Sequence, residues 1–341
     1  MSDQIGIGFI GAGGNTRLRH LPGFARIDGV RLVTVANRSV ESSQRVAEAF
    51  DVESVSPDWR AVIDHPDVDA VCIGTWPYMH AEMTVEALRA GKHVLTEARM
   101  ASNLSEARAM HAESMAHPDR VCQIVPSPFT LDFDKAIIGL LQAGTLGDVT
   151  EVFVDHSHGL YLDPDALMTW RQDPHYSGNN MLTMGIYHEA VQRWFPDPCS
   201  VDHVSSGTVT KERIHWETGE LRQVGLPDFL HILGHLERGT VLNYHFSGVE
   251  PGAGRNTIKL VGTKATLVVD LGEDTLVLSQ GNDPDQPILV PEEDKPGWGV
   301  EADFIESIRE GKPVKLTSFA DGVRYMEFTD AVYSRLPSLS C

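Results

Sequence analysis

The sequence predicts an α/β protein of two domains, a parallel-sheet domain followed by an α+β domain built on a large, mostly antiparallel sheet. Two observations lead to this prediction. The 341 residues, 42% of them hydrophobic, exceed the length at which a single core usually divides. Short apolar runs alternate with amphipathic stretches in the first third, as in β-α units, and longer strand-like alternations follow. We therefore expect domains at residues 1–125 and 126–341.

The first domain contains five apolar runs with the length of parallel strands. They lie at Ile5 to Ile10, Arg31 to Ala36, Ala70 to Ile73, His93 to Leu95 and Val121 to Val125. The stretches between them have helical spacing. In one of these stretches, Asn103 followed three residues later by Glu106 is typical of a helix start.

In the second domain the period changes after a helix predicted from about Asp132 to Ala143. Strand-like alternations occur at Val149 to His156, Phe229 to Leu236, Val241 to Phe246, Thr257 to Val261 and Ala265 to Val269. Three more helices are expected, at about Asn180 to Phe195, Glu301 to Glu310 and Asp321 to Ser334. Long strands with few helices are typical of an antiparallel sheet.

The charge balance excludes several classes of partner. The chain carries 48 acidic residues against 28 Lys and Arg, a net charge of −20, which repels nucleic acids and anionic lipid. No basic stretch precedes the first apolar strand, and no uncharged run approaches the roughly 20 residues that span a bilayer. The four cysteines show no CxxC spacing. We expect a cytoplasmic protein.

A glycine-rich loop directly follows the first strand and contains Gly11, Gly13, Gly14, Asn15 and Thr16. Glycines at this point permit a tight turn and let backbone amides approach a pyrophosphate at a helix N-terminus. Strand, loop and helix in this order predict a Rossmann domain that binds a nicotinamide dinucleotide. Thr16 stands where the usual pattern has its third glycine.

The second strand ends before Asn37 and Arg38, where the adenosine ribose of a dinucleotide would lie. An acidic residue here would hold the free 2′-hydroxyl of NAD. Arg38 can instead stack on adenine and neutralise a 2′-phosphate. We therefore expect NADP, with NAD as the alternative.

Further motifs occur along most of the chain. They are Thr75, Trp76, Pro77 and His80, the segment from Gly91 to Glu97, Trp170 with Arg171, the string Gly185, Ile186, Tyr187, and Phe304, Ile305, Gly311 and Lys312. With these motifs the chain resembles the glucose-fructose oxidoreductase, inositol dehydrogenase and rhizopine-catabolism family, Gfo/Idh/MocA. The resemblance implies hydride transfer between nicotinamide and a secondary alcohol or ketone of a sugar, inositol or related polyol. It also implies a homodimer or homotetramer, and cofactor contacts from Thr75, Trp76, His80 and Glu97.

The chain departs from this family at its usual catalytic residues. The family segment ends Glu, Lys, Pro, whereas Glu97 is followed by Ala98 and Arg99. An Asp and a His usually stand at the positions of Thr183 and Tyr187. In glucose-fructose oxidoreductase and dimeric dihydrodiol dehydrogenase, whose string this chain resembles, the tyrosine exchanges the proton. We therefore expect Tyr187 to be the acid/base, with Arg99 supplying the cation that would lower a phenol pKa near 10.

Histidines provide further candidates. His188 adjoins Tyr187, and an imidazole pKa near 6.5 suits acid/base work, so we expect it in the site. His156 and His158 share one strand face, as do His231 and His235, and His245 follows. Because their spacing matches no zinc motif, we expect no metal. The expected substrate contacts are Trp170, Arg171, Thr183, His156 and His158.

Two other functions remain open. The family lysine is replaced by Ala98 and the family aspartate by Thr183. These replacements favour a lyase or hydrolase that uses His188 and the sheet histidines on a glycoside or keto-sugar, without net redox change. They also fit a sensor that binds a dinucleotide or sugar without catalysis.

Overall fold

A computed structural model describes residues 4–336 and divides the chain into two compact units. The first unit comprises the chain up to residue 126 together with residues 299–326, and the second comprises residues 127–298 and the chain from 327 onward. The first boundary lies one residue from the expected one. The C-terminal part differs from the expected division, because residues 299–326 return to the first unit.

The first unit is built on a sheet of six parallel strands in the order β3-β2-β1-β4-β5-β6. Their bounds are β1 (Ile5–Ile10), β2 (Val30–Ala36), β3 (Ser54–Val55), β4 (Ala70–Ile73), β5 (His93–Thr96) and β6 (Cys122–Ile124). The order reverses between β1 and β4, which is the point where doubly wound sheets bind ligands. The carboxyl ends of these strands are therefore where a dinucleotide is expected.

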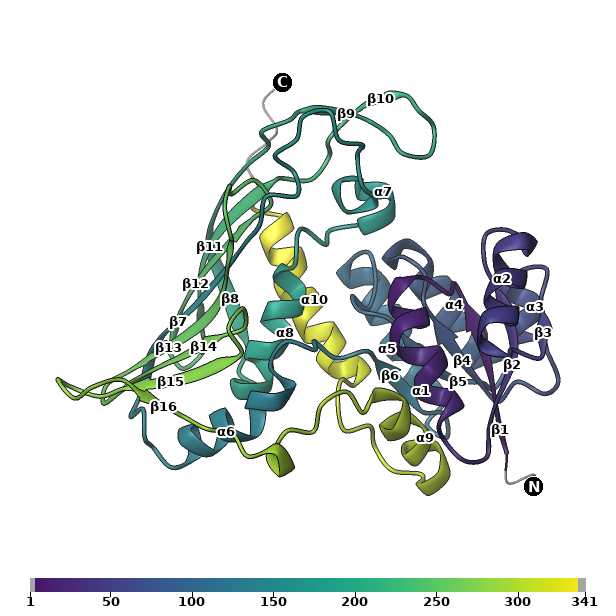
Figure 1. The fold of residues 1–341 in the computed structure, drawn as a ribbon, viewed down its shortest axis with the longest axis horizontal. Coiled ribbons are helices and arrows are strands. Elements are labelled where there is room, and N and C mark those ends of the chain that lie inside the picture. The colour runs from purple at the N-terminus through teal and green to yellow at the C-terminus, as the bar shows by residue number, and fades with distance from the viewer. Residues whose placement is uncertain (1–3, 337–341) are drawn as a thin grey trace. The chain divides into compact units, whose positions relative to one another are not determined.

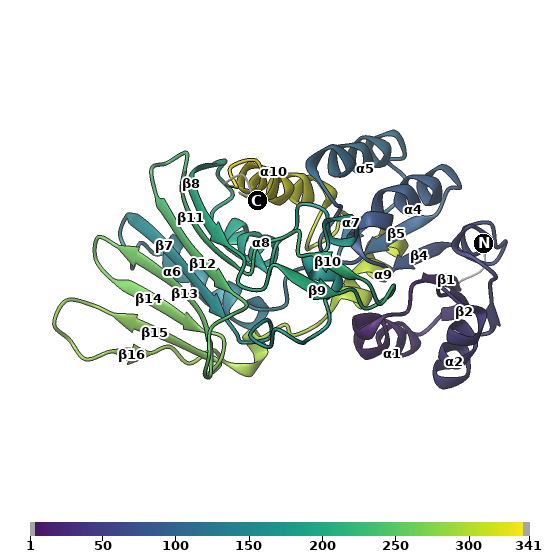
Figure 2. The same ribbon diagram turned by 90° about the horizontal axis from the view of Figure 1, so that it is seen from above.

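Helices cover both faces of this sheet, as Figure 2 shows for α1 and α2 on one face and α4 and α5 on the other. The bounds are η1 (Thr16–His20), α1 (Leu21–Ala25), α2 (Val40–Phe50), α3 (Trp59–Ile63), α4 (Pro77–Arg89) and α5 (Leu104–Ala116). The predicted start of α5 is confirmed: the Asn103 side chain accepts a hydrogen bond from the Glu106 amide at 3.0 Å. The side chain of Asn103 donates in turn to the Glu106 carboxylate.

The returning segment belongs to this unit through specific contacts. It contains α9 (Val300–Glu310) and the first part of α10 (Phe319–Tyr333). Phe304 of α9 packs edge-on against Phe24 of α1, with ring centroids 6.3 Å apart. Such a long-range contact has no local sequence signature, which is why the expected division missed it.

The second unit is built on an eight-stranded sheet in the order β16-β15-β14-β13-β7-β12-β11-β8. Its neighbours pair antiparallel except β7 and β12, which run parallel. The bounds are β7 (Val149–Ser157), β8 (Cys199–Gly207), β11 (Phe229–Leu236), β12 (Val241–Ser247), β13 (Arg255–Gly262), β14 (Thr266–Asp270), β15 (Thr275–Ser279) and β16 (Gln286–Pro287). A separate hairpin contains β9 (Glu212–Ile214) and β10 (Leu221–Gln223). The predicted fold class is confirmed.

One face of the large sheet forms the core of the second unit, and α8 runs along it (Figure 1). The helical segments are α6 (Leu131–Gln142), η2 (Trp170–Gln172), α7 (Pro174–Ser177), α8 (Met184–Trp194) and η3 (Glu292–Asp294). Buried side chains of α8 such as Tyr187 and Val191 pack with alternate residues of the strands, for example Val154 of β7. The intervening residues, such as Asp155, face the other way, so the sheet has an inner and an outer face.

Within residues 4–336 the structure contains no helix with the length and apolar character needed to cross a bilayer.

Candidate active site

The glycine loop after β1 has the backbone that its sequence predicts. Gly11 adopts φ +79°, and a Cβ there would lie 2.7 Å from the Thr75 side chain. No other residue fits this turn without strain. Gly14 is not crowded, since a Cβ at this position would meet nothing within 4 Å. Thr16 is buried, with its hydroxyl 3.3 Å from the Gly11 carbonyl oxygen, so it supports the loop from within.

A cavity of about 370 Å³ opens beside this loop. Its lining includes Gly11, Ala12, Gly13, Asn37, Arg38, Ser39, Gly74, Thr75 and Trp76. The walls are thus the carboxyl ends of β1, β2 and β4, at the reversal of strand order. Its size and its exposed glycine backbone fit part of a dinucleotide.

The end of β2 is held to the loop by Asn37. The side-chain carbonyl oxygen of Asn37 accepts a hydrogen bond from the Ala12 backbone amide at 2.6 Å. The side-chain amide of Asn37 donates to the Ser42 hydroxyl at 3.1 Å. Asn37 therefore shapes the cavity wall. The guanidinium of Arg38 lies 5.1 Å from the centre of the Trp76 ring, so a cation and an aromatic plane stand together at the expected adenosine end.

His80 of α4 is fully buried, which places it behind the cavity wall. Its Nε2 lies 3.0 Å from the Thr75 carbonyl oxygen and its Nδ1 2.9 Å from that of Arg99. Burial lowers the pKa of His80. The expectation that His80 contacts the cofactor is corrected. Both of its ring nitrogens bond backbone carbonyl groups that follow β4 and β5, so His80 supports the cavity wall.

Glu97, at the carboxyl end of β5, belongs to a network that the sequence did not predict. Its Oε1 accepts a hydrogen bond from the Asn15 amide at 2.6 Å and lies 3.0 Å from Nε2 of His20. Nδ1 of His20 lies 2.5 Å from Oε1 of Glu301 on α9. No local pattern marks His20 or Glu301, because Glu301 is far away in the sequence.

Arg99 does not line the dinucleotide cavity. Its side chain is only 2% exposed, and its backbone carbonyl faces His80. A guanidinium also does not exchange protons at neutral pH. The structure therefore gives no support to Arg99 as a replacement for the family lysine.

Tyr187 lies on the inner face of the large sheet. Its ring packs against Phe129, His156 and Phe246. Its hydroxyl donates a hydrogen bond to the side-chain carbonyl oxygen of Asn256. Burial raises the pKa of the phenol above its usual value. Tyr187 is therefore protonated and acts as a neutral hydrogen-bond donor.

His156 connects Tyr187 to the start of α8. Its Nδ1 lies 3.0 Å from the hydroxyl of Thr183, one helical turn before Tyr187. Burial lowers the pKa of His156 to about 4, with the neighbouring His158 adding to the shift. Asn256 pairs with His156 across β13 and β7. Tyr187, Thr183, His156 and Asn256 thus form one polar cluster, which we call the inner-face cluster.

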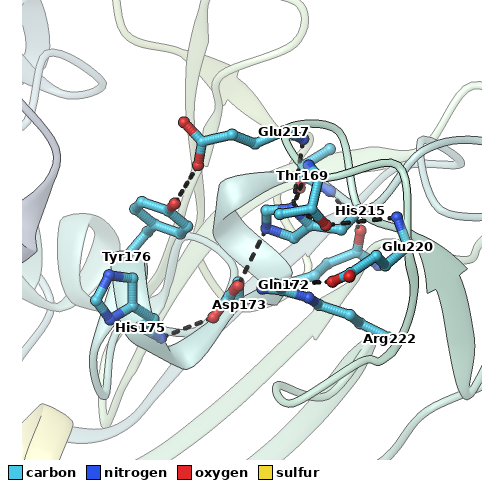
Figure 3. A network of polar contacts seen from close by, with 10 residues as sticks. Thr169, Gln172, Asp173, His175, Tyr176, His215, Glu217, Glu220 and Arg222 are labelled. Carbon is cyan, nitrogen blue, oxygen red and sulfur yellow. Dashed lines mark hydrogen bonds and ion pairs between the residues drawn. The ribbon is translucent and has the colours of Figure 1, made fainter. Parts of the chain in front are cut away.

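The predicted substrate residues Trp170 and Arg171 lie on η2, and the Arg171 guanidinium stacks 4.1 Å above the Trp170 ring. Burial lowers the pKa of His158, and the charge of Arg171 lowers it further, so Arg171 acts electrostatically on His158. A polar network secures this segment (Figure 3): His215 faces Asp173 at 3.3 Å, and Tyr176 donates to Glu217. The network thus holds the segment that follows Arg171.

His188 points away from Tyr187. Its ring stacks on Phe328 at 3.8 Å, and its nitrogens lie 3.2 Å from the Tyr244 hydroxyl and 3.5 Å from Cys199 Sγ. The side chain is 3% exposed. The expectation that His188 is catalytic is corrected: successive helix residues diverge by about 100°, so His188 contacts Phe328 and Tyr244 and lies outside the inner-face cluster.

The sheet histidines do not form one group. His231 and His245 stack at 4.4 Å on the outer face, where His245 bonds Asp155 at 2.8 Å. His156 instead packs against Tyr187 of α8, and His158 packs against His156. Among residues 4–336, no three His, Cys, Asp or Glu side chains converge in a way that could hold a metal ion.

Asn256 is the residue of the inner-face cluster that the sequence did not identify. It lies on β13, one of the predicted strands extended by two residues at its start. Its pairing with His156 depends on the register between β13 and β7, which no short pattern in the sequence reveals.

Comparisons with known proteins divide the chain near the same point, residue 126. The family model described as "Oxidoreductase family, NAD-binding Rossmann fold" matches residues 5–124, and the model of the GFO/IDH/MocA C-terminal domain matches residues 135–268. Inositol 2-dehydrogenase of Gluconacetobacter diazotrophicus is 31% identical over 201 residues, 57% of this chain and 55% of that protein. Levoglucosan dehydrogenase of Pseudarthrobacter phenanthrenivorans is 27% identical over 182 residues, 52% of this chain and 46% of that protein. The matches thus span about half the length of these relatives.

Solved structures support the fold. A levoglucosan dehydrogenase in complex with NADH and L-sorbose superposes with a TM-score of 0.87 at 21% identity, covering 97% of this chain and 96% of the other. An oxidoreductase domain protein from Kribbella flavida gives a TM-score of 0.87 at 23% identity, covering 98% and 97%. At these identities the likeness shows the shared fold.

Proposed function

Because this chain belongs to the Gfo/Idh/MocA family of oxidoreductases, we propose that it is an NAD(P)-dependent oxidoreductase of sugars, inositols or related polyols. The proposed reaction moves a hydride between the nicotinamide and a secondary alcohol or ketone of the substrate. The observation that carries the proposal is the cavity of about 370 Å³ that joins the Gly11 turn to Arg38 and Trp76. Its shape and position suit a dinucleotide.

The cofactor, when bound, supplies or accepts the hydride. The residues of the chain would hold it: the loop backbone near Gly11 and Gly13 at the pyrophosphate, and Arg38 with Trp76 at the adenosine. Arg38, Ser39 and Ser42 line this cavity together, and a guanidinium beside two hydroxyls favours a 2′-phosphate, hence NADP over NAD.

Tyr187 is the proposed acid/base. Because burial raises its pKa, the phenol is protonated, and in the reductive direction it would give its proton to the oxygen that forms as a ketone accepts hydride. The Asn256 carbonyl oxygen keeps the hydroxyl oriented beforehand. In the oxidative direction, the same phenol must lose its proton, so oxidation is expected to be favoured at high pH.

The substrate class is proposed from the groups around Tyr187. Thr183, His156 and His158 offer hydroxyl and neutral imidazole groups, each able to donate or accept a hydrogen bond. Arg171 adds a cation beside them. Such a set suits a ligand with several hydroxyl groups, and favours a sugar or cyclic polyol over an apolar alcohol.

Purified protein mixed with NADP or NAD and a panel of inositols, aldoses and anhydrosugars tests the proposal by absorbance at about 340 nm. We expect sustained reduction of one dinucleotide with at least one polyol, or its oxidation with the matching ketone. Binding of a dinucleotide without turnover on any substrate would favour the sensor alternative. Product formation without net reduction would favour the lyase alternative, although the separation of His188 from the other histidines argues against it.

We also propose that the chain forms a homo-oligomer through the outer face of the large sheet. A groove of about 400 Å³ lies on this face, lined among others by Phe153, His231, Leu233 and His245. Leu233 is 42% exposed in the single chain. A second copy covering this face would bury it.

A further inference from the structure

Three side chains from distant parts of the sequence, two of them buried, meet beside the dinucleotide loop. His20 ends the π-helical turn η1, Glu97 follows β5, and Glu301 lies in the first turn of α9. The His20 side chain is fully buried and that of Glu301 is 4% exposed, whereas that of Glu97 is 15% exposed. Of the three, Glu97 is therefore the side chain that reaches toward the surface.

The arrangement favours a charged histidine. A neutral imidazole has one N–H, yet both nitrogens of His20 face carboxylate oxygens, at 3.0 Å for Glu97 and 2.5 Å for Glu301. Only the imidazolium can donate to both carboxylates. Although burial opposes this charge, the two carboxylates raise the pKa of His20 to about 9. Burial acts to raise the pKa of Glu97, but the same contacts outweigh it and hold that pKa below its usual value.

Two further titratable groups lie near this network. Burial, with smaller effects from Glu97 and Glu301, raises the pKa of the Cys72 thiol on β4, so the thiol stays neutral. Burial lowers the pKa of His80 on α4, which Glu97 opposes only in part. Asn15 contributes a neutral donor. His20 is therefore the group here whose charge changes near pH 9.

The location of Glu97 relates the network to the cofactor. A dinucleotide bound across the carboxyl edge of the sheet has its pyrophosphate at the β1 loop and its adenosine toward β2. In the strand order β2-β1-β4-β5, the nicotinamide half extends the other way, toward the ends of β4 and β5. Glu97 directly follows β5. Asn15 and His20 both donate to the same oxygen of this carboxylate, Oε1.

We propose that His20 is a positioning residue for the dinucleotide: clamped by Glu301, it holds the Glu97 carboxylate ionised and oriented to accept a hydrogen bond from the nicotinamide half. This inference rests on the proposed dinucleotide binding. Through Asn15 the same carboxylate is tied to the glycine loop, so the clamp couples the returning α9 to the cofactor cavity. A role limited to anchoring α9 would affect the stability of this unit and would not weaken the nicotinamide dinucleotides selectively over ADP.

The test compares dissociation constants of the full-length protein for NADPH, NADH and ADP, measured by fluorescence and calorimetry. ADP occupies only the adenosine half. We expect His20→Gln to weaken the better reduced dinucleotide about 10- to 100-fold, the loss of a charge-assisted contact, and to leave ADP within about twofold. Glu301→Gln should act in the same direction, because it keeps the shape of the clamp and weakens its charge. His93→Gln, at the amino end of β5, is the matched control.

The second arm needs no variant. In the wild-type protein the dissociation constant of the dinucleotide should rise as the pH increases through about 9, while that of ADP stays flat. His20→Gln should remove this inflection. Equal loss of dinucleotide and ADP affinity, or a wild-type pH profile that His20→Gln leaves unchanged, would overturn the inference. If the wild-type protein binds neither NADPH nor NADH, the proposed function itself fails, which is a separate outcome.

Discussion

The phenol ring of Tyr187 packs against the imidazole of His156, with centroids 5.1 Å apart and planes inclined by 38°. The phenol hydroxyl bonds Asn256, and the imidazole bonds Thr183, so the two rings have separate polar partners. A neutral acid thus stands beside a neutral imidazole in one buried cluster. Their different chemistry leads to the first two predictions.

Tyr187→Phe should lower kcat by about 10²- to 10⁴-fold, because it removes the proposed proton donor and keeps the ring packing. The dissociation constant for the dinucleotide should stay within about twofold, measured by fluorescence titration. Tyr244→Phe is the matched control: it also deletes the hydroxyl of a buried tyrosine in the same core. If both variants lose activity equally, the loss reflects packing and Tyr187 has no role in proton transfer.

The stability of the protein should fall as the pH drops from about 6.5 toward 4, in part because of His156. Its pKa in the folded chain is lowered to about 4, mainly by burial, so the unfolded chain binds a proton more readily in this window. His156→Gln should flatten the slope of unfolding free energy against pH, measured by urea denaturation. A residual slope is expected, since burial also lowers the pKa of His93 to about 4. An unchanged slope would contradict the assignment.

His188→Ala should lower the stability of the protein and leave its turnover nearly unchanged. The variant loses the stacking on Phe328 and leaves the Tyr244 hydroxyl without its imidazole partner, at a cost of about 2–4 kcal/mol. The kcat of the folded fraction should remain within about twofold of wild type. A catalytic His188 would produce the reverse pattern, with normal thermal unfolding and lost turnover.

Arg38→Ala should weaken NADP binding about 10-fold or more and leave NAD binding within about twofold, because the guanidinium would pair with the 2′-phosphate. Arg60→Ala is a suitable control, since Arg60 also stacks on a tryptophan, 4.0 Å from Trp59, but lies outside the cavity lining. Calorimetric titration with each dinucleotide measures the two dissociation constants and hence the preference for NADP over NAD. Equal weakening of both dinucleotides would assign Arg38 to the adenine alone.

Light scattering after gel filtration should show a dimer or tetramer for the wild-type chain. Leu233→Glu places a charge on the outer face of the sheet and should shift the distribution toward monomer. Leu289→Glu provides the control, because Leu289 is 89% exposed and lies outside the outer-face groove. A monomeric wild-type protein would contradict the proposed oligomer.

Local patterns determined the two kinds of sheet, most helix positions and the glycine loop. The five predicted parallel strands all occur within two residues of their expected bounds, because a buried strand needs an apolar run of defined length. Gly11 was identifiable for a similar reason, since its turn excludes any side chain. These features depend on interactions between residues close in sequence.

Only the tertiary structure decided which polar groups meet. Tyr187 and His188 are adjacent in sequence, yet one joins the inner-face cluster and the other packs on Phe328, because the rotation of the helix separates them. His20 meets Glu301 and His156 meets Asn256 through contacts between distant segments, with partners fixed by strand register and helix packing. Sequence supplied the chemical groups, and the pairing of remote elements in the core determined their neighbours and hence their protonation.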